Sequence, residues 1–122
     1  EALKRLNAIM HPLIYEMIAE RIEKLGEKGR DVVVVEAALL LDAGWTSLVS
    51  EVWVTTSSGD QVVQRLQKRN MDEDAIRARI RSQMPQSERV RRSDVIVDNG
   101  GSLADLREKV ERLWSIRVLA RQ

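Results

Sequence analysis

Three short runs of β-branched and apolar residues, separated by segments with helical periodicity, constrain the fold of this chain more than any other feature. The runs cover 31–35 (Asp-Val-Val-Val-Val), 51–56 (Glu-Val-Trp-Val-Thr-Thr) and 94–99 (Asp-Val-Ile-Val-Asp-Asn). Unbroken β-branched runs are typical of strands buried on both faces of a parallel sheet. Because helical segments alternate with these strands, we predict an α/β fold of right-handed β-α-β units with a parallel sheet.

The spacing of apolar residues predicts helices around these strands. The first covers 13–25, begins after Pro12 and ends at Gly26, and we interpret its apolar stripe as core. A near match to the capping box, Ser102 with Asp105, predicts where the last helix begins. The stripe consists of Leu13, Met17, Ile18, Ile22 and Leu25, and the later helices are predicted over 60–69, 72–83, 85–92 and 102–118.

Composition narrows the class of protein. A length of 122 residues is enough for one domain, and no apolar run is long enough to cross a membrane. The absence of cysteine excludes disulfides and thiolate metal sites, and a single histidine excludes multi-histidine zinc sites. No signal peptide pattern opens the chain. We therefore expect a cytoplasmic protein, and the initial Glu1 leads us to expect a piece of a longer polypeptide.

Positive charge is concentrated in one segment, although the net charge is only +1. Residues 65–92 hold nine Lys and Arg against four Asp and Glu. This segment is either a local anion site or a well-solvated helical face. None of the four aromatic residues lies in it, so stacking on single-stranded nucleic acid is not favoured.

Ligands of open parallel sheets bind at the carboxyl ends of the strands, which directs attention to 36–42, 55–60 and 98–101. Glu36 and Asp42 are candidates for carboxylates near a metal, but helix capping explains them equally well. Asn99-Gly100-Gly101 either allows the backbone to approach a planar ligand or forms a left-handed turn.

Taken together, the motifs resemble one family. In order they are N-A-I-M-H-P-L-I (7–14), V-V-V-E-A-A-L-L-L-D-A-G (33–44), E-V-W-V (51–54), Q-R-L-Q-K-R (64–69), I-R-A-R-I-R-S-Q (76–83) and S-D-V-I-V-D-N-G-G (93–101). This succession resembles the dephospho-coenzyme A kinases, which are P-loop kinases, from about residue 7 to 114. The stretch 37–45 is also similar to the kinase part of bifunctional coenzyme A synthase.

The resemblance implies transfer of the γ-phosphoryl group of ATP, with Mg²⁺, to the ribose 3′-hydroxyl of dephospho-coenzyme A. This is the final step of coenzyme A biosynthesis. The implied partners are these small molecules, with no nucleic acid and no membrane. The implied organisation is a helical acceptor-side segment (1–30), core strands (31–60), a helical lid (61–92), and a last core strand with the C-terminal helix (93–122).

The resemblance also assigns residues. Arg65, Arg69 and Asn99 match positions expected at ATP. Gln83 and Arg89 match as well, although purely structural roles stay open for both. For Arg77, Arg79 and Arg81 we expect mostly solvent exposure. The acceptor side is matched by His11, Leu39, Leu40 and Asp42, with Ala38 and Asp42 standing where the family usually has proline and glutamate.

The phosphate-binding pattern G-x-x-x-x-G-K-[ST] does not occur in the sequence. The family's acid for the acceptor hydroxyl also has no counterpart here, so we assign no catalytic residue and no metal ligand. We expect an incomplete P-loop kinase-like fold without its P-loop strand, which belongs between 32–36 and 51–55, and no phosphoryl transfer by these residues alone. The exposed strand edges would pair with the protein's own N-terminal part, with another chain, or with each other. A non-catalytic kinase remnant and another P-loop kinase of small molecules or nucleotides are the alternatives.

Overall fold

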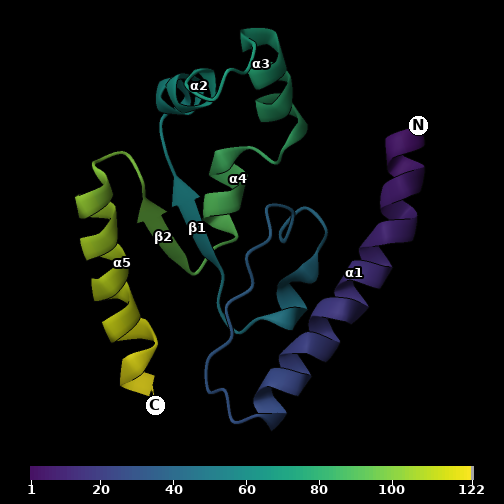
Figure 1. The fold of residues 1–122 in the computed structure, drawn as a ribbon, viewed down its shortest axis with the longest axis vertical. Coiled ribbons are helices and arrows are strands. Elements are labelled where there is room, and N and C mark those ends of the chain that lie inside the picture. The colour runs from purple at the N-terminus through teal and green to yellow at the C-terminus, as the bar shows by residue number, and fades with distance from the viewer. Residues whose placement is uncertain (122) are drawn as a thin grey trace. The chain divides into compact units, whose positions relative to one another are not determined.

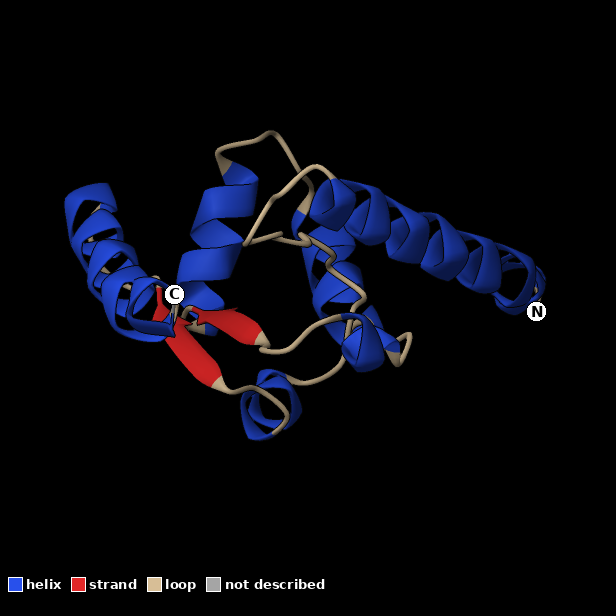
Figure 2. Ribbon diagram, turned by 90° about the horizontal axis from the view of Figure 1, so that it is seen from below, coloured by secondary structure: helices blue, strands red, loops and turns tan. Residues whose placement is uncertain are grey.

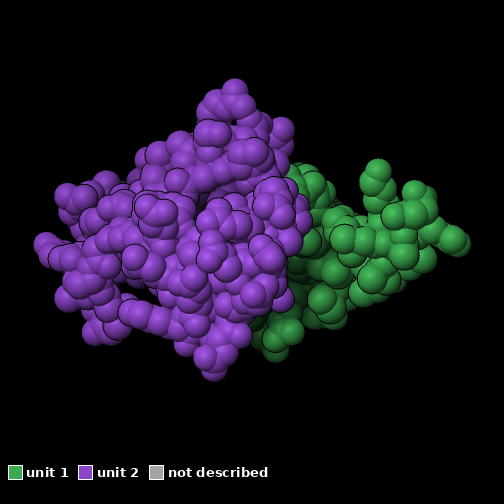
Figure 3. Space-filling view, turned by 90° about the horizontal axis from the view of Figure 1, so that it is seen from above, with its two compact units in different colours: residues 1–50 green, residues 51–122 purple. Residues whose placement is uncertain are grey.

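The computed structural model describes residues 1–121 and divides the chain into two compact units, Glu1–Ser50 and Glu51–Gln122 (Figure 3). The first unit contains helix α1 (Ala2–Glu27) and the 3₁₀ helix η1 (Trp45–Leu48). The second contains β1 (Trp53–Thr56), α2 (Gly59–Gln67), α3 (Glu73–Ser82), α4 (Gln86–Arg91), β2 (Val95–Asp98), α5 (Leu103–Arg117) and η2 (Leu119–Arg121) (Figure 1).

The second unit is built on a parallel pair of strands. β1 and β2 lie side by side with Trp53 opposite Val95 and Thr56 opposite Asp98 (Figure 2). Helix α5 packs against β2 and helix α4 packs against β1. The predicted α/β class with a parallel sheet is therefore confirmed, with two strands in the described residues.

The four helices predicted beyond residue 60 form, with bounds within about two residues of the prediction. Side-chain caps explain this agreement for α2, α3 and α5, because Ser58, Asp72 and Ser102 each accept a hydrogen bond from a backbone N–H of the helix that follows. At α5 the capping box is complete, since Asp105 Oδ2 in turn accepts from the Ser102 N–H at 2.8 Å. Whether the helices over 61–92 act as a lid stays a prediction.

The strand predicted over 31–35 is wrong. Residues 32–37 carry no regular secondary structure, and Val34 is 73% exposed. A strand persists only where its N–H and C=O groups bond a neighbouring strand, and this run forms no ladder within residues 1–121. β-branched residues alone were therefore insufficient to form a strand.

The first helix is longer and more exposed than predicted. It begins at Ala2, so Pro12 lies inside it rather than at its start, because the residues before Pro12 include good helix formers such as Ala2, Leu3 and Lys4. It ends at Glu27, beyond Gly26, and Gly29 takes the positive φ of +72° that follows. No residue of α1 is buried, and Leu13 and Met17 are 56% and 60% exposed. The interpretation of this stripe as core is wrong for this chain.

Within residues 1–121 the buried side chains are few and all apolar. Ile76 on α3 has no exposed surface, and it is the only large side chain there that is completely enclosed. Of the others, Leu41 and Trp45 belong to the first unit, and the three valines belong to the second. The six are Leu41, Trp45, Val54, Ile76, Val95 and Val97.

Candidate functional site

The carboxyl ends of β1 and β2 meet at one loop, residues 99–102 between β2 and α5, which we call the Asn99 loop. The Asn99 N–H, directly after β2, donates to the Thr56 carbonyl at the end of β1 over 2.8 Å. The Ser57 hydroxyl donates to the Asn99 carbonyl over 3.2 Å. The parallel register places both ends at the same edge of the sheet, which is the edge where ligands of such sheets bind.

Helix α2 holds the same loop through two side chains one turn apart. Arg65 donates from Nη1 to Ser57 Oγ at 3.1 Å and from Nη2 to the Asn99 carbonyl at 2.7 Å. Gln61 donates from Nε2 to the Gly100 carbonyl at 2.6 Å. Two of the three predicted nucleotide residues, Arg65 and Asn99, are thereby brought together although 34 positions separate them.

The backbone N–H and C=O of Asn99 both make hydrogen bonds, whereas its side chain makes none with residues 1–121. Its N–H and its carbonyl are bonded as described, and the side-chain amide makes no hydrogen bond within residues 1–121. An amide side chain both donates and accepts. Asn99 therefore presents, from a backbone that is held on both sides, an amide donor and acceptor that no residue among 1–121 uses at the ligand edge of the sheet.

The loop is also held on the side of α5. Lys109 Nζ lies 2.8 Å from Asp98 Oδ2, and the Gly100 N–H donates to Asp98 Oδ1 at 3.0 Å. The Lys109 hydrogen bond and then the Gly100 N–H lower the pKa of Asp98. The hydroxyl and then the N–H of Ser102 lower the pKa of Asp105 in the same way.

Close packing explains the two glycines after Asn99. A Cβ at Gly100 would lie 3.1 Å from Asp98 Oδ1, and a Cβ at Gly101 would lie 2.7 Å from Asp105 Oδ2. Neither glycine has a positive φ, because Gly29 and Gly44 are the ones that do in the described chain. The left-handed turn considered for this triplet is therefore wrong, and a Cβ at either glycine would crowd a neighbouring carboxylate.

The remaining basic residues of 65–92 divide into paired and unpaired groups. Arg77 bonds Glu73 and is exposed, as expected, and Glu88 pairs with both Arg91 and Arg92. Arg89 is in the unpaired group, because its buried Nε has no hydrogen-bond partner within residues 1–121. The exposed residues Arg69, Arg79, Arg81 and Gln83 have no described contact with the Asn99 loop.

The predicted acceptor-side residues all belong to the first unit. The His11 ring packs edge-on against Trp45, with ring centroids 5.5 Å apart, and the Tyr15 hydroxyl lies 3.0 Å from Ser47 Oγ. Both contacts join α1 to η1. In the turn before η1, Leu40 is half-buried, while Leu39 and Asp42 are exposed. The structure thus places His11 against η1, which follows this turn in the chain.

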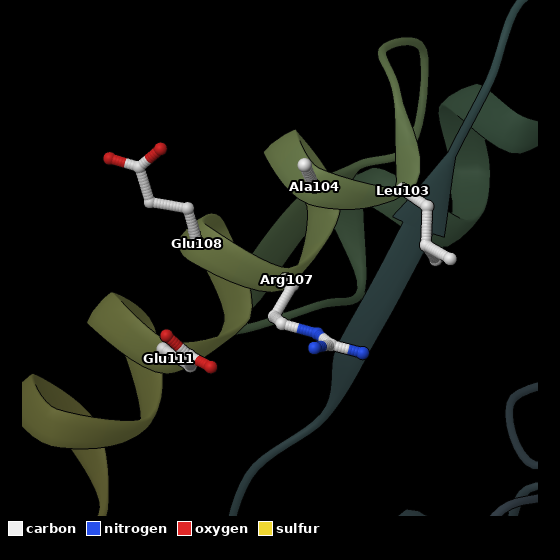
Figure 4. A pocket seen from close by; sticks show the side chains of 5 residues that line it. All are labelled: Leu103, Ala104, Arg107, Glu108 and Glu111. Atoms are coloured by element: carbon white, nitrogen blue, oxygen red, sulfur yellow. The ribbon is translucent and has the colours of Figure 1, made fainter.

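Neither metal-ligating side chains nor the hollow on α5 adds a second candidate site within the described residues. No group of three or more His, Asp or Glu side chains arranged to hold a metal ion occurs in residues 1–121, and no helix among them is long and apolar enough to span a membrane. A shallow hollow of about 350 Å³ is lined by α5 alone, through Leu103, Ala104, Arg107, Glu108 and Glu111. Glu108 points away from Arg107 (Figure 4), so these side chains do not converge on a ligand.

Comparison with known proteins identifies the family. The profile of the dephospho-CoA kinase family matches residues 1–105. The chain belongs to this family. A dephospho-CoA kinase of Dehalococcoides mccartyi is 38% identical over 119 residues, which cover 97% of this chain and 60% of the relative. That of Carboxydothermus hydrogenoformans is 40% identical over 111 residues, which cover 90% of this chain and 54% of the relative.

Solved structures agree with the family. The crystal structure of TT1252 from Thermus thermophilus superposes with a TM-score of 0.77 at 26% identity, over 95% of this chain and 60% of that protein. The dephospho-CoA kinase from Campylobacter jejuni superposes with a TM-score of 0.68 at 25% identity, over 100% of this chain and 61% of that protein. The chain thus spans 54% to 60% of the length of the two relatives described.

The site combines residues that the sequence indicated with others that it did not. Gln61 and Lys109 bond the Asn99 loop or Asp98 and were not predicted, whereas Ser57 lies in the segment 55–60 that the sequence had indicated. The S-x-x-Q spacing of Ser58 and Gln61 is a capping box that indicates a role for Gln61 in starting α2. Its contact with Gly100, 39 positions away, has no sequence signal.

Proposed function

We propose that the protein to which these residues belong transfers the γ-phosphoryl group of ATP to the ribose 3′-hydroxyl of dephospho-coenzyme A. Family membership supports this proposal, and the observation that carries it in the structure is the Asn99 loop. Asn99 is bonded through both backbone groups and offers an unused amide at the ligand edge of a parallel sheet. An amide in this position matches the donor and acceptor on the edge of adenine.

Arg65 and Arg69 complete the proposed nucleotide side. The Arg65 guanidinium is oriented by Ser57 and the Asn99 carbonyl, and its side chain is exposed, so its flat face is available to stack on a base. Arg69 is exposed on the turn after α2, where it can supply positive charge to phosphates. Phosphoryl transfer depends mainly on such positioning and charge neutralisation.

The acceptor side is proposed to lie in the first unit. His11 is held against Trp45, close to the turn that carries Leu39, Leu40 and Asp42. Apolar side chains together with a carboxylate in one turn suit a long, partly apolar acceptor such as a coenzyme. Coenzyme binding by this turn rests on the family alone.

The groups that cradle the phosphates and hold Mg²⁺ are proposed to lie outside these 122 residues. The sequence has no G-x-x-x-x-G-K-[ST] pattern, and residues 1–121 have no cluster of metal-ligating side chains. Mg²⁺ neutralises charge on the transferring phosphoryl group when it is bound. The residues described here would orient the nucleotide and the acceptor, and we propose that they transfer no phosphoryl group by themselves.

The test is a kinase assay of the natural gene product with ATP, Mg²⁺ and dephospho-coenzyme A. We expect formation of coenzyme A and ADP in equal amounts. Asn99→Ala should weaken ATP binding more than acceptor binding, and Arg65→Ala should lower kcat/KM for ATP about tenfold or more. Arg79→Ala, an exposed residue in the same basic segment, is the matched control and should change neither.

Each alternative gives a different result in this assay. Phosphorylation of a nucleoside monophosphate, with dephospho-coenzyme A left unchanged, would indicate another kinase of the P-loop class. Nucleotide binding without turnover would indicate a non-catalytic remnant. If Asn99→Ala raised the KM of the acceptor alone, the assignment of Asn99 to the nucleotide would be wrong.

A further inference from the structure

Gln61 makes two hydrogen bonds with different consequences. Its Oε1 accepts from the Ser58 N–H at 3.2 Å and so completes the capping box of α2. Its Nε2 donates to the Gly100 carbonyl at 2.6 Å. One half-buried side chain therefore joins the start of α2 to the loop after β2.

The loop has little freedom around this contact. A Cβ at Gly100 would lie 3.1 Å from Asp98 Oδ1 and 3.4 Å from Gln61 Oε1, so Gly100 sits between these two side chains. Arg65, four residues after Gln61, holds the preceding carbonyl of Asn99. Two successive carbonyls are thus held by two side chains from adjacent turns of one helix.

We propose that Gln61 is a positioning residue that sets the direction of the Asn99 side chain and thereby selects adenine over guanine nucleotides. This proposal rests on the proposed function, in which Asn99 contacts the base. Adenine presents a donor at N6 beside an acceptor at N7, which one amide pairs with completely. Guanine presents two acceptors, O6 and N7, so either orientation of a fixed amide leaves its oxygen facing an acceptor.

Selection of this kind requires that the amide stay in place. If the loop could shift, Asn99 would move away from guanine and the mismatch would be lost. Ser57 and Arg65 hold the Asn99 carbonyl, and Gln61 holds the next carbonyl along the loop, that of Gly100. Gln61 therefore acts on the base through Asn99 and does not itself touch the nucleotide.

Gln61→Glu separates the two hydrogen bonds. Glutamate still accepts from the Ser58 N–H, as in other capping boxes, but it cannot donate to the Gly100 carbonyl when ionised. Ser58→Ala removes the side-chain cap and keeps Gln61. Gln64→Glu adds the same charge at an exposed position of the same helix. The three variants distinguish the loop contact from the cap and from the added charge.

The experiment measures kcat/KM for ATP and for GTP with the natural gene product, together with the Kd of each nucleotide by calorimetry. We expect Gln61→Glu to lower the ATP to GTP ratio about tenfold, mainly through KM, because one hydrogen bond that fixes the loop is lost. Ser58→Ala and Gln64→Glu should leave the ratio unchanged. An unchanged ratio in Gln61→Glu, or an equal decrease in either control, would overturn the proposal.

The binding measurement keeps this result separate from the proposed reaction. If the natural protein binds ATP more tightly than GTP but does not phosphorylate dephospho-coenzyme A, the proposed function fails, and the ratio of Kd values still tests Gln61. If the natural protein turns over dephospho-coenzyme A equally well with ATP and GTP, the proposed reaction stands and the role of Gln61 is wrong. Binding of neither nucleotide would refute both.

Discussion

The two units differ in how their chain segments are held. In residues 51–121, two strands pair, three helices begin with side-chain caps, and four of the six side chains that are buried within residues 1–121 are found. In residues 1–50, α1 has no side-chain cap and no buried residue, and the buried side chains are Leu41 and Trp45. Helices form in both units from local signals, whereas a strand forms only in the unit that contains its partner.

The difference has a physical basis. A helix satisfies its backbone hydrogen bonds within one segment, so α1 is present even though no residue of its apolar stripe is buried. A strand depends on a neighbour for every hydrogen bond, so residues 32–35 remain irregular.

The largest effect is expected at Ile76, which is completely buried on α3. We expect Ile76→Ala to lower the free energy of unfolding by about 3 kcal/mol, because the cavity cannot fully collapse. Urea unfolding followed by circular dichroism measures this change. Leu13→Ala, on the exposed stripe of α1, should cost less than about 0.5 kcal/mol.

The Leu13 variant also tests whether α1 of the first unit is as exposed in solution as it is in the structure. A loss at Leu13 comparable to that at Ile76 would mean that another polypeptide segment or a second copy of the chain covers α1 in solution. Ile80→Ala, at a 43% exposed position on the same helix as Ile76, controls for the change in helix propensity.

A smaller effect is expected at Glu51, which joins the start of the second unit to its end. Its carboxylate is 12% exposed and bonds Arg117 at 2.6 Å and Arg121 at 3.0 Å. We expect Glu51→Ala to lower the free energy of unfolding by about 1–2 kcal/mol, because two guanidinium groups lose their partner. Arg121→Ala should cost less than about 1 kcal/mol, since Arg121 is largely exposed and Arg117 remains. Equal losses in both variants would contradict this ranking.

The caps of the second unit should contribute about 1 kcal/mol each. Ser102→Ala removes the hydroxyl that accepts from the Asp105 N–H, so the first turn of α5 should fray and the free energy of unfolding should fall by about that amount. Amide hydrogen exchange at the start of α5 reports the fraying directly. Ser115→Ala, late in the same helix, is the control for the loss of a hydroxyl. Unchanged exchange at 103–106 would show that the cap contributes nothing.

The smallest effect is expected from the ion pair of Asp98 with Lys109. The pKa of Asp98 is lowered in the folded chain, so the contribution of this pair is present above about pH 4 and is lost as the pH falls through the depressed pKa. Lys109→Met removes the largest cause of that shift. The chemical shift of the Asp98 carboxyl carbon should then titrate at a higher pH than in the unsubstituted chain. An unchanged titration would show that Lys109 does not bond Asp98 in solution.

The helices beyond residue 60 were predictable because their start signals are local. Ser58, Asp72 and Ser102 each lie directly before the helix that they cap. The strands at 53–56 and 95–98 were predictable in position and in direction, since a helical segment connects them. The strand at 31–35 was not, because sequence reasoning assigned it a neighbour that the described residues do not provide.

In the candidate site, too, residues within recognisable motifs were predicted, whereas residues defined by distant partners were not. Asn99 and Arg65 were indicated by the motifs that carry the family, and the structure places them 2.7 Å apart, from Nη2 to the carbonyl oxygen. Gln61 and Lys109 were missed, because their partners lie 39 and 11 positions away and no local pattern connects them. The close approach of Asp105 to Gly101 was also missed, since only the folded chain brings the two residues together.

The sequence by itself determined the helices, their caps, the α/β class and the family of this protein, because periodicity, capping residues and ordered motifs are encoded within short segments. Only the tertiary structure decided which β-branched runs became strands, which apolar stripes were buried, and which side chains hold the Asn99 loop. Those outcomes depend on groups that are distant in the chain and meet only after it folds. A hydrogen bond or a buried surface requires both partners, and the sequence of either one alone does not specify the other.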